Sequence, residues 1–304
     1  MFAAAAAGGA VALVALRRGR AKREGRSVDR GWPVDFAHRG ASARAPENTM
    51  EAFRFAAASG ARGLETDVHM TLDGRVVAIH DDSVDRTTDG DGLVREMTLA
   101  ELKGLDAGYR FTADGGATYP YRGRGVRVPE VGEVFREFPG LAVNIEIKEN
   151  QTGVEEALLG IIEEEGAEER ALVVSGRARP VRLFRKLSGG KVRTGASARE
   201  IVTFYYLSRL HLEGFLQPPY DALQVPVERR GTRVVTPRFL EAAHARGVRV
   251  DVWTIDDPRE MRRLLDLGAD AIMTNRPEVL EEVLRPGSAS DGGVSGGSET
   301  GLPG

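Results

Sequence analysis

The sequence contains no cysteine among its 304 residues. This absence excludes a disulfide framework, a thiol nucleophile and a zinc finger built on cysteine ligands. An excess of charge of one sign is also missing, because 42 basic and 45 acidic residues are mixed along the chain and give a formal net charge of −3. Proteins that bind nucleic acids usually concentrate basic residues on one face. We therefore expect no nucleic-acid partner.

Long apolar runs are also lacking. The N-terminal run of apolar and small residues covers positions 1–16, which is shorter than the ~20 residues that span a bilayer. Positions 17–23 follow it with five basic side chains. Residues 1–23 are therefore either a membrane anchor with its basic flank in the cytoplasm or an Ala-rich disordered leader. The first interpretation predicts a membrane-associated protein with a cytoplasmic globular part, and the second predicts a soluble cytoplasmic protein.

The two ends of the chain enclose a segment that can fold. Residues 287–304 are rich in Gly, Ser and Asp and carry almost no apolar side chains, so they cannot offset the entropy lost on ordering. We expect a disordered tail there. Residues 34–285 are long enough to form one large hydrophobic core.

Short apolar runs of strand character alternate with amphipathic stretches in this segment. The runs cover 34–37, 63–68, 76–79, 142–147, 171–175, 192–196, 222–227, 249–254 and 271–274. Helical patterns lie between them, for example at 154–165, 180–187, 237–246 and 258–267, and glycines often follow, as helix C-caps prefer. Repeated βα units imply a parallel sheet. About eight such units in ~250 residues predict a (β/α)8 TIM barrel.

Two segments break this rhythm. Residues 82–127 are too long for an ordinary connection, so this segment is expected to be functional or to form structure of its own. Residues 204–219 are unusually aromatic and aliphatic for a connection. They are either the fifth barrel helix, packed on the sheet, or an apolar lip at the barrel mouth that meets an acyl chain or a bilayer surface.

Two carboxylates point to a metal site. Glu65 and Asp67 are two positions apart in a strand-like run, and the period of two sends both side chains to one face. A buried pair of like charges is costly without a cation. Glu146 follows the same logic on the next predicted barrel strand and can complete a triad. Oxygen-only ligands favour Mg²⁺ or Ca²⁺ over zinc.

Two histidines end strand-like runs. His38 begins a loop that continues through Arg39 and Gly40 to a helix start at Pro46. His80 ends the run 76–79. Imidazole titrates close enough to neutral pH to act as both acid and base. A histidine at a strand end is more often a solvated or hydrogen-bonded residue than a catalyst, so the joint arrangement carries the catalytic interpretation.

These motifs together resemble one family. His38-Arg39-Gly40, Pro46-Glu47-Asn48-Thr49, Glu65-x-Asp67 and His80-Asp81 are similar to the signature of the glycerophosphodiester phosphodiesterases, and segments 144–148, 252–254 and 268–277 are similar to later blocks of that family in the same order. The resemblance covers about residues 34–285. It is closest to the membrane-anchored subgroup, some of whose members cleave lysophospholipids. It implies a TIM barrel with a small insertion after the second strand, at about residues 82–127, and a metal-dependent hydrolase of phosphodiesters.

The resemblance also implies roles for individual residues. His38 and His80 are the expected catalytic pair, with His38 as the first base and His80 as the first acid. Substrate-binding residues are Arg39 and Lys148, which can contact phosphate oxygens, and Trp253, which is either barrel core or a wall for the alcohol moiety. The expected metal ligands are Glu65, Asp67 and Glu146. Asn275 stands where relatives commonly carry aspartate, which puts a charge role there in doubt.

The remaining candidates have lesser expected roles. Asn48 is expected to hold the first loop. His69 is expected to be structural, and His211 and His244 are expected to lie on the surface. Gln224 and Glu228 are possible mouth residues.

The leading function is hydrolysis of glycerophosphodiesters to an alcohol and glycerol 3-phosphate, which the family is thought to carry out through a cyclic phosphate. One alternative is lysophospholipase D-type hydrolysis of lysophospholipids. A rival from another class is a catalytically silent barrel that binds a head group, which we would expect to lack one of the histidines or carboxylates. A sugar-phosphate isomerase ranks last, because it gives no reason for three converging acids.

Overall fold

The computed structural model describes residues 31–148 and 153–285. The leader predicted at 1–23 and the tail predicted at 287–304 lie outside these described residues. Within the described ranges, no helix is both long enough and apolar enough to cross a lipid bilayer.

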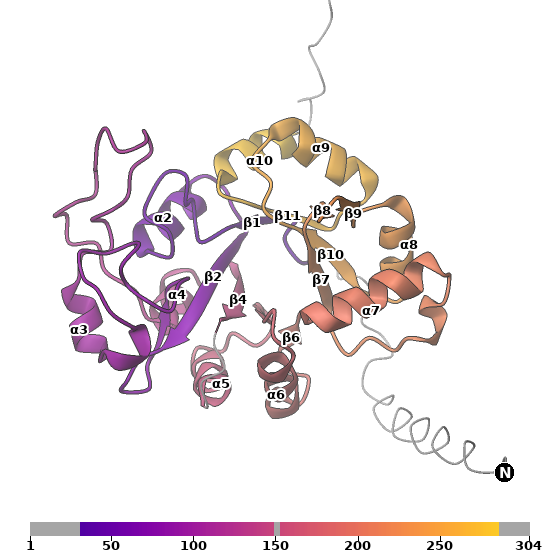
Figure 1. Ribbon diagram of the computed structural model, residues 1–304, viewed down its shortest axis with the longest axis horizontal. Helices are drawn as coiled ribbons and strands as arrows, with labels where there is room; N and C mark the ends of the chain where they lie inside the picture. The colour runs from indigo at the N-terminus through magenta and orange to yellow at the C-terminus, as the bar shows by residue number, and fades with distance from the viewer. Residues whose placement is uncertain (1–30, 149–152, 286–304) are drawn as a thin grey trace, which may run out of the picture.

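Eight parallel strands form a ring in the described part of the chain (Figure 1). Neighbouring strands follow the order β6-β5-β4-β2-β1-β11-β10-β7, and a parallel bridge between Gly195 and Ala222 joins the two ends of this order. The predicted TIM barrel is therefore confirmed. The strands are β1 (Asp35–Ala37), β2 (Gly63–Met70), β4 (Ala142–Ile147), β5 (Ala171–Val174), β6 (Arg193–Thr194), β7 (Ala222–Val225), β10 (Arg249–Val252) and β11 (Ala271–Thr274).

Helices surround the ring, and local sequence signals set their ends. The side chains of Thr49, Thr236 and Asp257 cap helix N-termini, and proline occupies the first turn of three helices. Gly268 ends one helix with a φ of 102°. The helices are α2 (Met50–Ala58), α4 (Val131–Glu137), α5 (Val154–Glu164), α6 (Ala178–Ser188), α7 (Ala198–Arg209), α8 (Pro237–Ala245), α9 (Pro258–Leu267) and α10 (Pro277–Leu284).

Alternation along β4 separates an apolar outer face from a polar inner face. On β4, Ile145 and Ile147 are buried in the cluster that also holds side chains of α5 and α6. Asn144 lies on the opposite face and hydrogen-bonds Gln224 of β7 at 3.2 Å. Because β4 and β7 are not neighbours in the sheet, this contact crosses the barrel interior. Polar side chains on this inner face are thus available to the site.

An insertion follows the second barrel strand, and it begins earlier than the expected residue 82. It contains β3 (Val76–Ala78), η2 (Val94–Glu96) and α3 (Leu99–Gly104). The run 76–79 is not a barrel strand, because β3 pairs antiparallel with β2. The insertion has a small core of its own, formed by Val77, Ile79, Val84, Val94, Leu102, Ala107, Val126 and Val128.

Both interpretations of residues 204–219 find support on different faces of the segment. Phe204 of α7 is fully buried and meets Phe239 of α8 edge-on, with ring centroids 5.6 Å apart. This is the packed barrel helix. The opposite face and η3 (Glu213–Phe215) leave Tyr206, Leu210 and Phe215 exposed by 62%, 65% and 87%.

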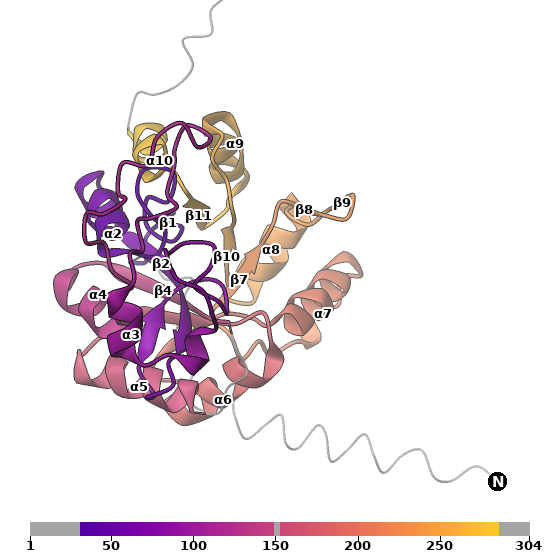
Figure 2. The same ribbon diagram turned by 60° about the vertical axis from the view of Figure 1, so that its left-hand side comes forward.

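The connection from β7 to α8 forms a second small sheet. β8 (Glu228–Arg229) and β9 (Thr232–Arg233) pair antiparallel with each other. Figure 2 shows this hairpin projecting from the body of the molecule on the same side as the end of α7.

One buried acid near the start of β1 makes the stability of the fold depend on pH. Asp35 is 2% exposed and accepts hydrogen bonds from the backbone N–H and the side chain of Arg62. Burial raises the pKa of Asp35 from 3.8 to about 6, against the opposing effect of Arg62. The folded protein therefore binds this proton more tightly than the unfolded chain does.

We predict that Asp35 contributes stability below about pH 4 and that this contribution is lost as the pH rises to about 6. A shift of about two pKa units corresponds to about 3 kcal/mol. Urea unfolding of the wild type and of Asp35→Asn between pH 4 and 7 checks this. The free energy of unfolding of the wild type, relative to the variant, should fall across that range, and a constant or rising difference would contradict the assignment.

Candidate active site

Three carboxylates converge inside the barrel. Glu65 and Asp67 come from β2 and Glu146 from β4, where Asp67 and Glu146 are direct partners in the parallel register. One oxygen from each of the three carboxylates lies within 4.8 Å of the others. Glu65 and Asp67 are 4% and 1% exposed. The spacing of two on β2 and the pairing with β4 therefore bring together the acids that the sequence indicated.

Two cations partly balance this acidic cluster. The Nζ of Lys148 lies 2.9 Å from Asp67 and 2.7 Å from Glu146. The Nε of Arg39 lies 3.1 Å from Asp67, although not at an angle that makes a hydrogen bond. Burial opposes ionisation of Asp67, but these two cations outweigh it and lower the pKa of the carboxyl. Asp67 is thus held as a carboxylate.

The charge of Glu65 is balanced less well by neighbouring cations than the charge of Asp67. Burial, and next the charge of Asp67, raise the pKa of Glu65 well above its usual range. Its Oε2 accepts a hydrogen bond from the backbone N–H of Arg39 at 2.9 Å, and the Nε2 of His38 is 4.0 Å away. A divalent cation would offset this buried charge, and an all-oxygen donor set suits Mg²⁺ or Ca²⁺. The residues present therefore fit a metal site.

His38 is held by an amide. It follows β1, and its Nδ1 lies 2.8 Å from the Oδ1 of Asn275. The amide orientation is fixed because the Nδ2 of Asn275 donates to Asp256 at 2.7 Å, while Ser42 donates to the same Oδ1 at 2.8 Å. Nδ1 of His38 must therefore carry the proton, and Nε2 turns toward Glu65. Burial lowers the pKa of His38.

Sequence reasoning gave no role to Asn275 beyond doubting a charge there. In the structure, Asn275 hydrogen-bonds His38, and the carboxylate of Asp256 hydrogen-bonds Asn275. Asp256 also accepts the backbone N–H of Asn275 at 2.8 Å. The sequence signal that could have identified this pair is a polar residue after each of the adjacent strands β10 and β11.

His80 is held by a carboxylate. Its Nδ1 lies 2.6 Å from the Oδ1 of Asp81, and the Nε of Arg86 donates to the other oxygen of Asp81 at 2.5 Å. Burial opposes ionisation of Asp81, but the hydrogen bonds from Arg86 and His80 outweigh it and lower the pKa of Asp81 to about 2. His80 therefore contacts an ionised carboxylate.

The element that carries His80 differs from the one that the sequence predicts. The sequence pattern predicts that the run 76–79, which precedes His80, is one of the barrel strands, whereas His80 follows β3 of the insertion. The backbone N–H of Ile79 donates to the carbonyl of Asp67 at 3.0 Å, which holds this end of the insertion against β2. His69 bonds the carbonyl of His80 at 3.1 Å, in keeping with a structural role.

The first loop is tied to the insertion and to β2. Glu47 accepts hydrogen bonds from Arg39 at 3.0 Å and from Arg86 at 2.7 and 2.8 Å. Asn48 donates to Asp67 at 3.1 Å and accepts from Thr66 at 2.8 Å, as expected for a residue that holds the loop. These contacts connect the segments that carry the two histidines.

Gly40 explains why the loop can turn where it does. It adopts a φ of 78°, and a Cβ at this position would lie 2.7 Å from the backbone of Ala52. Only glycine avoids both the strain and the clash.

The remaining candidates separate clearly. Trp253 follows β10 and is 43% exposed, so it is not barrel core. Gln224 lies inside the barrel, hydrogen-bonded to Asn144, and Glu228 is exposed on the hairpin. His211 is exposed, and His244 is partly exposed and bonded to Asp270 at 2.8 Å.

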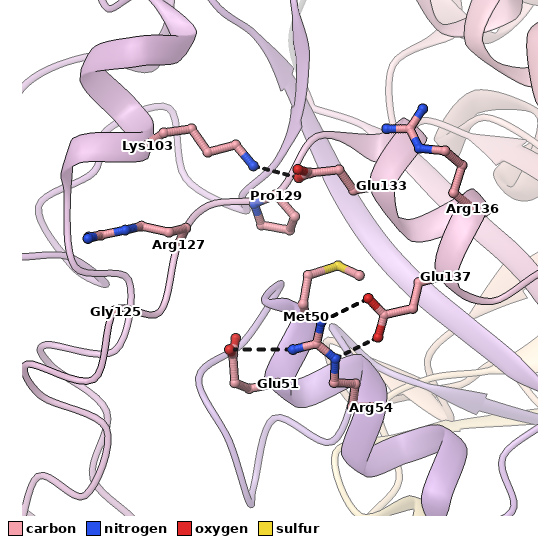
Figure 3. A pocket seen from close by; sticks show the side chains of 10 residues that line it. All are labelled: Met50, Glu51, Arg54, Lys103, Gly125, Arg127, Pro129, Glu133, Arg136 and Glu137. Carbon is pink, nitrogen blue, oxygen red and sulfur yellow. Dashed lines mark hydrogen bonds and ion pairs between the residues drawn. The ribbon is translucent and has the colours of Figure 1, made fainter.

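A cleft lies outside the barrel, between the insertion and helices α2 and α4 (Figure 3). Its volume is about 690 Å³, and none of the candidate site residues line it. Its cations are engaged locally: Arg54 pairs with Glu137 and Lys103 pairs with Glu133, both at 2.5 Å. The cleft is therefore separate from the chemistry described above.

Comparisons with known proteins identify the family of the chain. The sequence model of the glycerophosphoryl diester phosphodiesterase family matches residues 38–279. A glycerophosphodiester phosphodiesterase from Caldanaerobacter subterraneus is 36% identical over 260 residues, which cover 83% of this chain and 98% of the relative. A second protein of that name, from Bacillus altitudinis, is 33% identical and covers 80% and 94%.

Solved structures give the same result. A phosphodiesterase from Oleispira antarctica, in complex with the product sn-glycerol-3-phosphate, superposes with a TM-score of 0.67 at 27% identity, covering 83% of this chain and 96% of that one. A phosphodiesterase domain from Mycobacterium tuberculosis has a TM-score of 0.74 at 21% identity, over 83% and 98% of the two chains, and supports the fold. The chain belongs to the glycerophosphoryl diester phosphodiesterase family.

Proposed function

We propose that this enzyme hydrolyses glycerophosphodiesters to an alcohol and glycerol 3-phosphate. The observation that carries the proposal is the convergence of three carboxylates with two imidazoles that have different partners, at the carboxyl end of one barrel. The names of the curated relatives and the product bound to the Oleispira antarctica structure support the same substrate class.

Glu65, Asp67 and Glu146 would hold a divalent metal ion, Mg²⁺ or Ca²⁺. Such an ion supplies Lewis-acid polarisation of the phosphoryl group when it is bound. Lys148 and Arg39 already lie beside Asp67 and present cationic groups to the same place. Their role in this proposal is to contact the phosphate oxygens, Arg39 through its planar fork.

The two histidines have different hydrogen-bond partners, and this difference suits one to act as a base and the other as an acid. The Oδ1 of Asn275 accepts a hydrogen bond from the Nδ1–H of His38. The Nε2 of His38 therefore keeps its lone pair, which suits a base. Ionised Asp81 can hold a doubly protonated His80, which suits an acid. This difference supports His38 as the first base and His80 as the first acid.

The reaction then proceeds in two steps. The neighbouring glycerol hydroxyl gives its proton to His38 and its oxygen bonds to phosphorus, while the bond to the alcohol oxygen breaks and His80 protonates that oxygen. Water then opens the resulting cyclic phosphate, with the roles of the histidines reversed. Trp253, exposed at the rim, would form a wall for the departing alcohol.

A second candidate substrate class is lysophospholipids. The observation in its favour is the exposure of Tyr206, Leu210 and Phe215 on α7 and η3, which could meet an acyl chain or a bilayer. Membrane association through residues 1–23 stays a prediction, since that stretch lies outside the described residues.

We predict that glycerophosphocholine is hydrolysed in the presence of Mg²⁺ or Ca²⁺ and yields glycerol 3-phosphate and choline. Measuring choline release from glycerophosphocholine and lysophosphatidylcholine side by side separates the two substrate classes. Turnover of the lysophospholipid alone would favour the second candidate. Failure on both, with ligand binding unaffected by His38→Ala, would indicate a silent barrel.

Removal of either imidazole should abolish most of the activity. We expect His38→Ala and His80→Ala each to lower kcat by about 10² to 10⁴, the usual contribution of a positioned acid or base. His211→Ala is the matched control, because this histidine is exposed and lies outside the site. Steady-state kinetics on glycerophosphocholine tests the pair, and a loss below about tenfold in both variants would refute the assignment.

Chelation should remove activity and also stability. Because an ion would offset the buried charge of Glu65, we expect EDTA to abolish turnover and Mg²⁺ or Ca²⁺ to restore it and raise the Tm. Glu65→Gln should lose the rise in Tm, whereas Glu137→Gln, in the outer cleft, should keep it. Full activity after exhaustive chelation, or an equal rise in Tm in both variants, would count against the metal site.

A further inference from the structure

The hairpin between β7 and α8 carries a group of arginines that the proposed reaction does not use. Residues 228–233 are all exposed. They include Arg229, Arg230 and Arg233 against one acidic residue, Glu228. The two short strands β8 and β9 hold these side chains on a paired backbone instead of a loose loop.

The hairpin stands at the mouth of the barrel. The backbone N–H of Trp253 donates to the carbonyl of Val225 at 3.2 Å, and that of Val234 donates to the carbonyl of Val227 at 2.9 Å. The hairpin therefore begins at Val227, two residues after Val225, the backbone partner of Trp253. Figure 2 shows β8 and β9 projecting away from the strands of the ring.

The hairpin also lies opposite the acidic cluster. Counted along the sheet in either direction, β7 is four strands from β2, which carries Glu65 and Asp67. A diester whose phosphate lies near the acidic cluster, and whose alcohol passes Trp253, extends toward the arginines. The hairpin is thus placed to meet the alcohol moiety and not the reacting phosphate.

The three guanidinium groups are available for a ligand. None of them forms an ion pair with an acidic side chain among the described residues. Arg233 acts on the charge of Glu260, but the pKa of Glu260 is lowered mainly by a hydrogen bond from Arg263 and less by Arg233. In contrast, the exposed Arg54 and Arg75 are each paired with a glutamate.

We propose that the arginine hairpin binds a second anionic group, a phosphate or a carboxylate, on the alcohol moiety of the substrate. Guanidinium groups suit this task because their planar fork matches such oxyanions. The inference rests on the proposed function and narrows it to diesters whose alcohol carries its own negative charge. The anion can belong to a free diester or to the head group of a lysophospholipid.

The test uses two substrates that differ by one phosphate. We compare kcat/KM for glycerophosphoinositol 4-phosphate and glycerophosphoinositol, with glycerophosphocholine as reference. The wild type should prefer the phosphorylated substrate by about tenfold at low salt, since exposed charge pairs each contribute modestly and are screened at higher salt. The same pair as lysophospholipids in phosphatidylcholine vesicles identifies which source of the anion is used.

Two double variants separate the hairpin from general charge effects. Arg229→Gln/Arg230→Gln should reduce the preference to about twofold or less, with glycerophosphocholine turnover unchanged. Lys186→Gln/Lys191→Gln removes the same charge from exposed positions at the end of α6 and should keep the preference. Equal kcat/KM for both inositol substrates in the wild type, or a preference that survives in the hairpin variant, would overturn the proposal.

Two further outcomes are distinguishable. If the hairpin variant keeps the substrate preference but no longer sediments with vesicles that contain phosphatidylglycerol, the arginines bind a lipid surface and the proposal is wrong. If no glycerophosphodiester is hydrolysed, glycerophosphocholine included, the proposed function fails and the hairpin inference falls with it.

Discussion

The site depends on three carboxylates held together, two of which, Glu65 and Asp67, are almost completely buried. Register brings Asp67 beside Glu146, and strand alternation adds Glu65 on the same face of β2. Such a cluster is unfavourable without cations. Lys148 and Arg39 balance the negative charge of Asp67, but burial still raises the pKa of Glu65. The remaining need for positive charge is what makes this rim suited to a metal ion and an anionic substrate.

The same demand organises the surrounding loops. Arg39 contacts Asp67 through its side chain and Glu65 through its backbone, and Glu47 joins it to Arg86. Arg86 in turn holds Asp81 against His80. A single chain of charges thus runs from the acidic cluster to one imidazole. The other imidazole depends on the neutral amide of Asn275, and this difference in partners distinguishes the two histidines chemically.

Much of this arrangement follows from the sequence, because it depends on local periodicity. The spacing of Glu65 and Asp67, the alternation at Glu146 and the glycine of the first loop are all readable without coordinates. Contacts over long separations were not readable: His38 and Asn275 are 237 positions apart. The sequence also indicates His80, but it does not show that the preceding run pairs antiparallel with β2, since a short apolar run carries no information on pairing direction. The exposure of Trp253 likewise depends on how β10 ends at the rim.

The central claim is that Glu65, Asp67 and Glu146 together bind one divalent ion. The most direct measurement is anomalous X-ray scattering from crystals of the protein grown with Mn²⁺, which replaces Mg²⁺ or Ca²⁺ at oxygen sites. The account predicts one strong anomalous peak among the three carboxylates, with Lys148 moved away from Asp67. A well-ordered site without such a peak, with the amine of Lys148 still between Asp67 and Glu146, would contradict it.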